Sequence, residues 1–383
     1  MKFTIVASYQ FHSGYESLTN SLAQALHQRG HTVTVLGVGY GGLEHVFPWT
    51  LIPCPASYVP QAVYRLHKQS AYDCLLFVMD IPNIVVNLAV LQRDQPAWLA
   101  SVKTGGVFPV ESDPVSPKWA KGLAALTQRF PLTSFGLNEL QSVGLDAVRL
   151  PYGPATFWYE PPSSADLDRY PILKGVAARP FILTVAKNQH RKNLVASMEI
   201  AREAIAHAEA RGESLTYVLV TDPKNPEGWD LQKAAVENNY LPGQLILVER
   251  SILSAKALRA LYFHARAFLL TSLAEGIGLP VYEAQAQGCP VVATNCCAIP
   301  EAVRSGALID VDRRTPYPWG DTHHYWVDVE DGVKKLEQVL ADAPRVIAEY
   351  PDANAWGALI EQAMSAKTTQ PNAEVLDCAK ELV

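Results

Sequence analysis

Apolar runs and amphipathic stretches alternate along the first part of the chain. Residues 2–8 and 31–37 predict the first two strands, and the nearly continuous apolar run at 73–80 predicts a strand buried on both faces of a sheet. Between the first two strands, residues 14–30 carry apolar side chains three and four positions apart, which predicts a helix that ends at Gly30. Strands that alternate with helices in this way indicate a parallel sheet covered by helices.

The same pattern continues with less regularity and then breaks. We expect helices over 83–92 and 117–128 and strands over 97–103, 131–136 and 147–153. Residues 158–180 are rich in Pro, Ser and charge and show no sustained period, so they are interpreted as an interdomain linker.

The alternation restarts after the linker. The strands expected here are 180–187, 215–221, 245–249, 267–271 and 289–294, and the helices are 192–211, 229–238, 254–264, 280–287, 329–349 and 354–366. The chain is therefore predicted to be an α/β protein with two doubly wound Rossmann-like domains, residues 1–165 and 166–383, facing across a cleft. The final helices are expected to pack back toward the first domain. Ligands of such sheets bind at the carboxyl ends of the strands, so the cleft is the expected site.

Composition narrows the class of protein. The chain has 383 residues and a net charge of -6, which argues against a general nucleic-acid binder because such proteins are usually basic. The six cysteines form no C-x-x-C pair and are interpreted as reduced thiols.

The N-terminal apolar run is too short for a signal-peptide core, and no run approaches the length of a membrane span. A cytoplasmic protein is therefore expected.

Two glycine-bearing turns in the first half are candidates for ligand contact. Gly37 to Gly42 has the G-x-G-x-x-G spacing of a dinucleotide turn, but Pro48 and Pro53 leave no room for the helix that such a turn requires. We therefore interpret it as a loop at the rim of the cleft. Gly14 opens a helix, where backbone N–H groups favour an anion, although a plain strand-to-helix turn explains it equally well.

The segment "TSLAEGIGLPVYEAQAQGCPVVAT" (271–294) carries the most specific pattern. Glu275 lies in a glycine-bearing loop and Glu283 in the helix that follows, at a separation of up to ~12 Å. Carboxylates so far apart suit the hydroxyl groups at two ends of one elongated ligand. The N–H groups of 276–279 at the helix N-terminus suit an anion between them. Hydroxyls at both ends with phosphate in the middle describe a nucleotide-sugar.

"EGIGLPVYE", between "LLTS" and "A-x-x-G-x-P-V-V-A-T" and followed by "IPEAV" (299–303), resembles the E-x7-E motif of retaining glycosyltransferases with the GT-B fold, glycosyltransferase family four. The resemblance implies that Glu275 and the backbone of Gly276, Ile277 and Gly278 hold the donor hexose. It also implies that Leu279 contacts the diphosphate and Glu283 the ribose. The alternative is a solvated loop carboxylate and a helix-surface glutamate.

A basic block in "ILTVAKNQHRKNLVAS" also matches the family. Cations after a strand end stabilise the charge that develops on a diphosphate leaving group. The resemblance offers Lys187, Arg191 and Lys192, of which we favour Arg191 and Lys192 as catalytic residues together with Glu275; a solvated helix start is the alternative. The resemblance covers nearly the whole chain and is strongest over 181–303. The usual N-domain histidine is missing from 101–109, so no catalytic residue is assigned there.

These patterns predict a metal-independent glycosyltransferase, and the resemblance to the family implies that it is a retaining one. It would move a hexose from a nucleotide-diphosphate sugar, UDP- or GDP-hexose, to a hydroxyl of a small-molecule, lipid-linked or glycan acceptor. No cofactor, metal or nucleic acid is expected, and the acidic chain gives no support for peripheral membrane contact. The alternatives are another sugar-nucleotide enzyme such as a 2-epimerase, a non-catalytic sugar-nucleotide-binding protein and, from Gly37 to Gly42 alone, a dehydrogenase.

Overall fold

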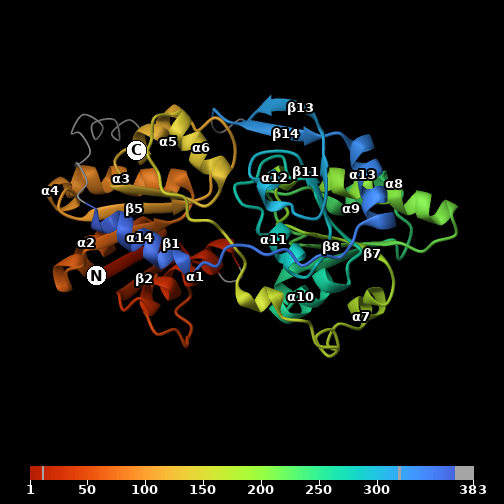
Figure 1. Ribbon diagram of the computed structural model, residues 1–383, viewed down its shortest axis with the longest axis horizontal. Coiled ribbons are helices and arrows are strands. Elements are labelled where there is room, and N and C mark those ends of the chain that lie inside the picture. Colours follow the sequence, from red (N-terminus) through yellow and green to blue (C-terminus); the bar gives the residue numbers. More distant parts are fainter. Residues whose placement is uncertain (11–12, 318–320, 367–383) are drawn as a thin grey trace. The chain divides into compact units, whose positions relative to one another are not determined.

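The chain folds into two compact units, each built on a six-stranded sheet (Figure 1). A computed structural model describes residues 1–10, 13–317 and 321–366. The first unit contains Met1–Gly153 and the segment from Pro351 onward, and the second contains Pro154–Tyr350. All paired strands of both large sheets are parallel. The predicted class, two doubly wound Rossmann-like domains, is confirmed.

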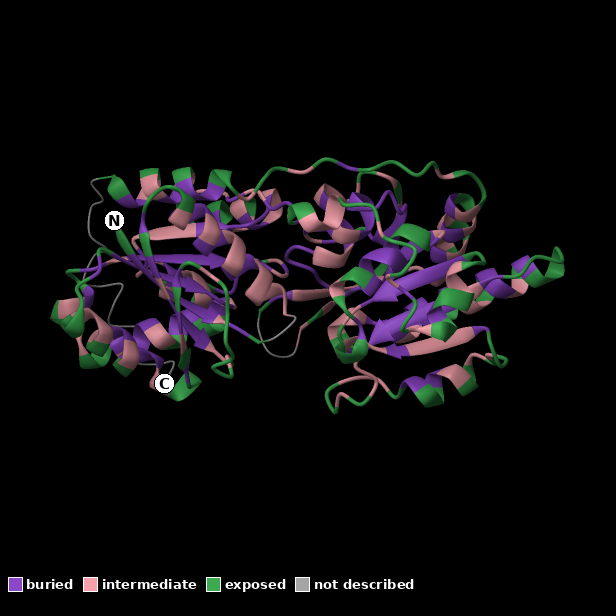
Figure 2. Ribbon diagram, turned by 90° about the horizontal axis from the view of Figure 1, so that it is seen from below, coloured by how far each residue is buried: buried purple, intermediate pink, exposed green. Residues whose placement is uncertain are grey.

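The sheet of the first unit has the strand order β3-β2-β1-β4-β5-β6. Its strands are β1 Lys2–Ser8, β2 Thr32–Val38, β3 Thr50–Cys54, β4 Cys74–Val78, β5 Lys103–Phe108 and β6 Gln128–Pro131. Its helices are α1 Gly14–Gln28, α2 Val59–Gln69, α3 Ile81–Asp94, α4 Pro96–Leu99, α5 Pro117–Leu123, α6 Ser134–Ser142 and α14 Ala355–Ser365. Figure 2 shows that the buried residues concentrate in the strands. β4 is buried along its whole length, as its continuous apolar run predicts.

The sheet of the second unit has the order β12-β11-β10-β7-β8-β9. Its strands are β7 Phe181–Val185, β8 Thr216–Thr221, β9 Leu245–Glu249, β10 Ala267–Leu270, β11 Val291–Thr294 and β12 Gly306–Ile309. Its helices are α7 Pro171–Ala177, α8 Leu194–Ala210, α9 Leu231–Glu237, α10 Ala255–His264, α11 Leu279–Ala286, α12 Ile299–Ala302 and α13 Val329–Asp342. A separate two-stranded antiparallel ribbon, β13 Val311–Pro316 and β14 His323–Val327, follows β12.

The strand orders determine where each sheet opens for a ligand. In the second sheet, the chain runs from the central β7 outward to β9, returns to β10 on the other side of β7, and continues outward to β12. The first sheet has the same reversal, with β1 and β4 as the central pair. At such a switch point the two following connections leave in opposite directions and open a crevice at the carboxyl ends of the strands. In the second unit, these connections are residues 186–193 and 271–278.

The division between the units falls earlier in the chain than the predicted boundary after residue 165. The buried Arg259 of α10 donates to the carbonyl of Phe157 at 2.9 Å and to the carboxylate of Glu160 at 2.7 Å. Gln287 donates to the carbonyl of Glu160 at 3.1 Å. Residues predicted as a linker therefore pack on the second unit, and that stretch contains helix α7.

Three strand predictions in the first half are wrong. Residues 97–103 begin as helix α4, because Pro96 stands at a helix start, and the strand begins only at Lys103. Residues 131–136 end β6 and enter α6. Residues 147–153 follow β6 with two isolated hydrogen bonds, both 2.9 Å long, from Val148 and Leu150, and form no strand.

The G-x-G-x-x-G stretch ends β2 and enters a loop. Residues 39–49 contain no helix, as Pro48 and Pro53 predict. The alternative of a dinucleotide-binding turn, which requires such a helix, is therefore wrong. The side chains of Leu43 and Val46 are exposed on this loop. His12, which precedes α1 in the sequence, and Cys378, one of the six cysteines, lie outside the described residues.

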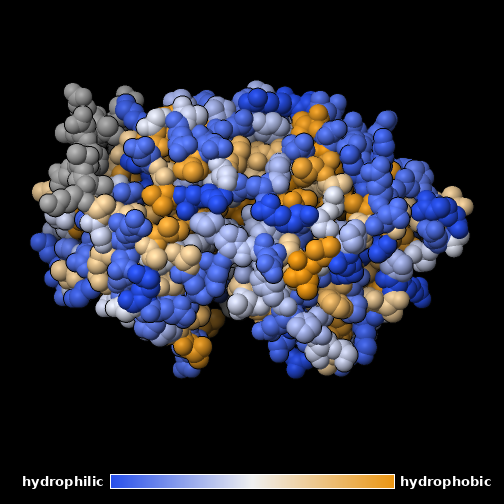
Figure 3. Space-filling view, in the orientation of Figure 1, coloured by the Kyte–Doolittle hydropathy of each residue, from blue (hydrophilic) through white to orange (hydrophobic). Residues whose placement is uncertain are grey.

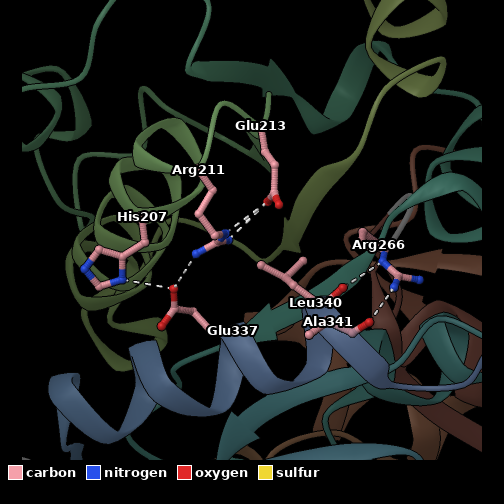
Figure 4. A network of polar contacts seen from close by, with 7 residues as sticks. All are labelled: His207, Arg211, Glu213, Arg266, Glu337, Leu340 and Ala341. Atoms are coloured by element: carbon pink, nitrogen blue, oxygen red, sulfur yellow. Dashed lines mark hydrogen bonds and ion pairs between the residues drawn. The ribbon is translucent and has the colours of Figure 1, made fainter.

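The two C-terminal helices belong to different units. α14 packs on α1, where Arg29 and Glu361 form an ion pair at 2.5 Å and Trp356 is fully buried. α13 packs on α8, where Glu337 accepts from His207 at 3.0 Å and from Arg211 at 3.5 Å (Figure 4). The expected helix over 329–349 ends at Asp342, two residues before Pro344.

Hydrophilic residues cover much of the surface shown in Figure 3, with apolar residues in scattered groups. Within the described ranges, the longest apolar helix falls short of what crossing a bilayer requires.

Candidate functional site

The connections after β7 and β10 are joined by hydrogen bonds at the switch point of the second sheet. The Leu273 N–H donates to the carbonyl of Arg191 at 2.7 Å. The Thr271 hydroxyl donates to the carbonyl of Asn193 at 2.9 Å. The basic block and the E-x7-E loop, about 80 residues apart in sequence, therefore form one structure at the position where such sheets bind ligands.

Asn193 explains the local form of the basic block. Its φ of 48° lies in the left-handed region, which asparagine tolerates better than most residues, and α8 begins at the next residue. This turn ends the short helical segment His190–Lys192. Arg191 and Lys192 then reach the E-x7-E loop.

Glu275 accepts hydrogen bonds from both of these cations. Arg191 Nη1 lies 3.2 Å from Glu275 Oε2 and 2.6 Å from the carbonyl oxygen of Ala274. Lys192 Nζ pairs with Glu275 Oε1, to which the Ser272 hydroxyl also donates at 3.2 Å. The side chains of Glu275, Lys192 and Arg191 are only 7%, 14% and 21% exposed. The residues that the sequence singled out as catalytic are thus in direct contact.

The charges in this cluster fix the state of Glu275. Burial alone favours the protonated carboxyl, but the nearby charges of Lys192 and Arg191 outweigh it and lower the pKa of Glu275 to about 2. The carboxylate is therefore ionised at neutral pH. Two cations and one anion leave one net positive charge, so the cluster is electrostatically suited to an anionic ligand.

The start of α11 adds backbone donors beside the cluster. Gly278 has a φ of 76°, a conformation that a side chain would strain, and precedes the helix as its N-cap. Gly276, Ile277 and Gly278 are buried. In the part of the chain that the structure describes, the N–H groups from Gly276 to Leu279 donate to no protein acceptor. Buried donors at a helix N-terminus favour an anion.

Glu283 lies in α11 in a different environment. The buried Tyr262 hydroxyl donates to Glu283 Oε2 at 2.9 Å. Burial of the carboxyl raises the pKa of Glu283 to about 7, although the hydrogen bond from Tyr262 and the charge of Arg250 oppose this. Its role as a ribose ligand stays a prediction.

Glu283→Gln is expected to stabilise the protein in alkaline solution. A raised pKa in the folded state means that the neutral carboxyl supports folding below about 4.5, and this contribution is lost as the pH rises through about 7. Glutamine mimics the neutral group. We expect the thermal midpoint to rise by roughly 3 °C at pH 8 and by much less at pH 5. Circular-dichroism melting checks this, with exposed Glu349→Gln as the control; equal shifts of Glu283→Gln at both pH values would contradict it.

Lys187 and Gly14 were also predicted to contact the ligand. Lys187 follows β7 and is exposed, and the described residues give it no ion pair. Of the three basic residues that the resemblance offers, Arg191 and Lys192 contact Glu275. Gly14 belongs to the first unit, where Ser13 caps α1 by accepting from the N–H of Glu16 at 3.1 Å. Its part in diphosphate binding stays a prediction.

Sequence reasoning missed two parts of the site. Ser272 bonds Glu275 and stands in the "LLTS" flank, a position that the pattern marked without assigning it a role. The β13–β14 ribbon was not predicted, yet the N–H of Tyr325 on this ribbon donates to the carbonyl of Leu273 at 2.8 Å. The run "HHYWV" has the aromatic content of a strand and was the available signal.

Comparison with known proteins gives a family for part of the chain. Residues 179–343 match the family described as glycosyl transferases group 1. This segment belongs to the group 1 glycosyltransferases. It holds the complete Arg191, Lys192 and Glu275 cluster.

A curated relative and several solved structures are similar to the chain. The serotype-specific mannosyltransferase WbdA of Escherichia coli is 29% identical over 164 residues, which cover 42% of this chain and 18% of that protein. The chain thus matches under a fifth of the length of this relative. Anabaena Alr3699/HepE, solved in complex with UDP and glucose, is 15% identical with a TM-score of 0.65 and covers 100% of this chain and 98% of that one.

Two further structures are similar to the chain along its whole length. Sucrose-phosphate synthase from Thermosynechococcus elongatus is 15% identical with a TM-score of 0.66, covering 100% of this chain and 97% of that one. The lipopolysaccharide outer core galactosyltransferase WaaB is 11% identical with a TM-score of 0.57, covering 100% and 99%. At these identities the likeness establishes the fold, which is the predicted GT-B fold.

Proposed function

We propose that the protein is a retaining glycosyltransferase that moves a hexose from a nucleotide-diphosphate sugar to an acceptor hydroxyl. The observation that carries this proposal is the buried carboxylate of Glu275, which is held ionised between Arg191 and Lys192. It lies beside the backbone N–H groups of Gly276 to Leu279. The cations and N–H groups suit the diphosphate. The carboxylate suits hexose hydroxyls. The group 1 match and the mannosyltransferase relative support this donor class.

The reaction needs stabilisation of a departing diphosphate. The bond between the hexose C1 and the β-phosphate oxygen breaks, and C1 bonds to the acceptor oxygen on the same face of the sugar. The acceptor proton passes to the leaving phosphate. Arg191 and Lys192, whose side chains are largely buried, stabilise the developing negative charge. These two cations do the work that a metal ion does in other transferases, so we propose a metal-independent reaction.

In this scheme Glu275 positions the sugar and does not attack it. Its carboxylate already accepts bonds from Arg191, Lys192 and Ser272, which fix its orientation. A group held this rigidly suits the selection of one hydroxyl geometry. Glu283 at the other end of the motif would take the ribose. A UDP- or GDP-hexose is the proposed donor, and UDP has the additional support of the Anabaena structure that contains it.

A donor panel tests the proposed function. The protein is incubated with UDP-, GDP-, ADP- and dTDP-hexoses and a set of sugar acceptors, with and without EDTA. We expect nucleotide release with one donor, at the same rate in EDTA, and a product whose anomeric configuration by NMR matches that of the donor. Tight donor binding without turnover would instead support a sugar-nucleotide-binding protein, and an altered free sugar would support an epimerase.

A further inference from the structure

The β13–β14 ribbon reaches the proposed donor site without being part of the large sheet (Figure 1). The Tyr325 N–H donates to the carbonyl of Leu273 at 2.8 Å, and the Leu273 N–H donates to the carbonyl of Arg191 at 2.7 Å. These two bonds link the ribbon, the E-x7-E loop and the basic block in one row. Side chains of β14 next to Tyr325 are therefore close to Arg191.

The two faces of the ribbon carry different side chains. Successive residues of a strand point to opposite faces, so His324 and Trp326 share one face and His323 and Tyr325 the other. On the first face, Trp326 Nε1 donates to the Thr315 hydroxyl at 2.9 Å, and Thr315 is the cross-strand partner of His324. On the second face, the His323 ring nitrogen Nδ1 lies 2.7 Å from Arg314 Nη2.

On the ribbon, the ring of His324 is affected by the positive charge of Arg191. The ring is half-buried and lies against Tyr317, with ring centroids 4.5 Å apart. Burial and the positive charge of Arg191 lower the pKa of His324 to about 4, so the imidazole is neutral at pH 7. A neutral imidazole carries one N–H donor and one acceptor nitrogen. Among the described residues, neither nitrogen has a hydrogen-bond partner.

We propose that His324 is a further residue of the donor site and donates a hydrogen bond to the diphosphate beside Arg191. This inference rests on the proposed function. An anion bound to Arg191 lies near the imidazole of His324. Its negative charge offsets the positive charge of Arg191 and so favours a proton on the imidazole. The ribbon then adds a third side chain to the two cations that stabilise the leaving group. His324 lies outside both sequence motifs of the site, the basic block and the E-x7-E motif.

Calorimetric titration tests the inference without an acceptor. The unaltered protein is titrated with UDP, GDP, ADP and dTDP, and the variants are compared with the diphosphate that binds most tightly and with the corresponding nucleoside. A hydrogen bond to a charged group corresponds to about a tenfold change in affinity. We expect His324→Ala to bind the diphosphate about tenfold more weakly and the nucleoside as before, and His324→Gln, which keeps an N–H donor, to recover part of the loss.

His323→Ala is the matched control, because this residue is the sequence neighbour on the opposite face of the ribbon. It should bind the diphosphate like the unaltered protein. Unchanged diphosphate affinity in His324→Ala would overturn the inference, as would an equal loss for diphosphate and nucleoside, which would indicate damage to the fold. If the unaltered protein bound none of the four diphosphates, the proposed function itself would fail, and the inference with it.

Discussion

Glu275→Gln is expected to lower hexose transfer by about 10²–10³-fold while nucleoside diphosphate binding is kept or tightened. The amide has the size of the carboxylate but no charge, so it holds sugar hydroxyls poorly in the transition state. At the same time, the cluster with Arg191 and Lys192 goes from one net positive charge to two, which favours the diphosphate. Initial rates of nucleotide release and calorimetric titration with the diphosphate measure the two effects separately.

Glu337→Gln is the control for this experiment. Glu337 also contacts two basic side chains, His207 and Arg211, but on the surface between α8 and α13 (Figure 4). Its loss should leave transfer unchanged, since surface pairs contribute little. Full hexose transfer by Glu275→Gln would contradict the proposal that this carboxylate binds the donor hexose.

Lys192→Ala is expected to reduce both stability and transfer. The substitution leaves Glu275, which is 7% exposed, with Arg191 as its remaining cation. Breaking a buried pair from one side costs about 3 kcal/mol, because a charge stays buried with less compensation. The pKa of Glu275, about 2 in the folded protein, would rise toward its usual value. Loss of the cation from the diphosphate site should lower transfer by about 100-fold.

The pH dependence distinguishes this effect from general damage. A lowered pKa means that ionised Glu275 contributes stability above about pH 4.5, and this contribution is lost as the pH falls toward 2. The stability difference between Lys192→Ala and the unaltered protein should therefore be larger at pH 7 than at pH 4, as measured by urea unfolding. Lys233→Ala, which breaks an exposed pair with Glu237, is the control. A difference that is the same at both pH values would contradict the buried-pair account.

The grouping of Arg191, Lys192 and Glu275 follows from segments that are each local in sequence. Each strand, connection and helix around Glu275 and Arg191 is short, and special backbone positions mark the turns, such as Gly278 and Asn193 with positive φ. Two parallel strands on either side of a switch point place their following loops together whatever the intervening sequence. The contact between Arg191 and Glu275 follows from that topology, although its distances do not.

Other features depend on contacts that no local pattern encodes. Residues 158–160 have a linker composition, but Gln287 donates to the carbonyls of Trp158 and Glu160. Arg259 donates to the carboxylate of Glu160, and these bonds hold the stretch on the second unit. The ribbon strand β14 is short and without strict polar alternation, so its pairing with β13 decides its form. Trp98 and Leu99 are as compatible with a strand as with α4, and only Pro96 favours the helix.

The central claim is that Arg191 and Lys192 of the second unit bind a nucleoside diphosphate. A thermal-shift screen with UDP, GDP, ADP and dTDP tests it most directly, because a ligand that binds the folded protein raises its unfolding midpoint. The account predicts that one diphosphate raises the midpoint by several degrees, and that the variant with both Arg191→Ala and Lys192→Ala loses this shift. No shift with any of the four, or the same shift in the double variant, would contradict it.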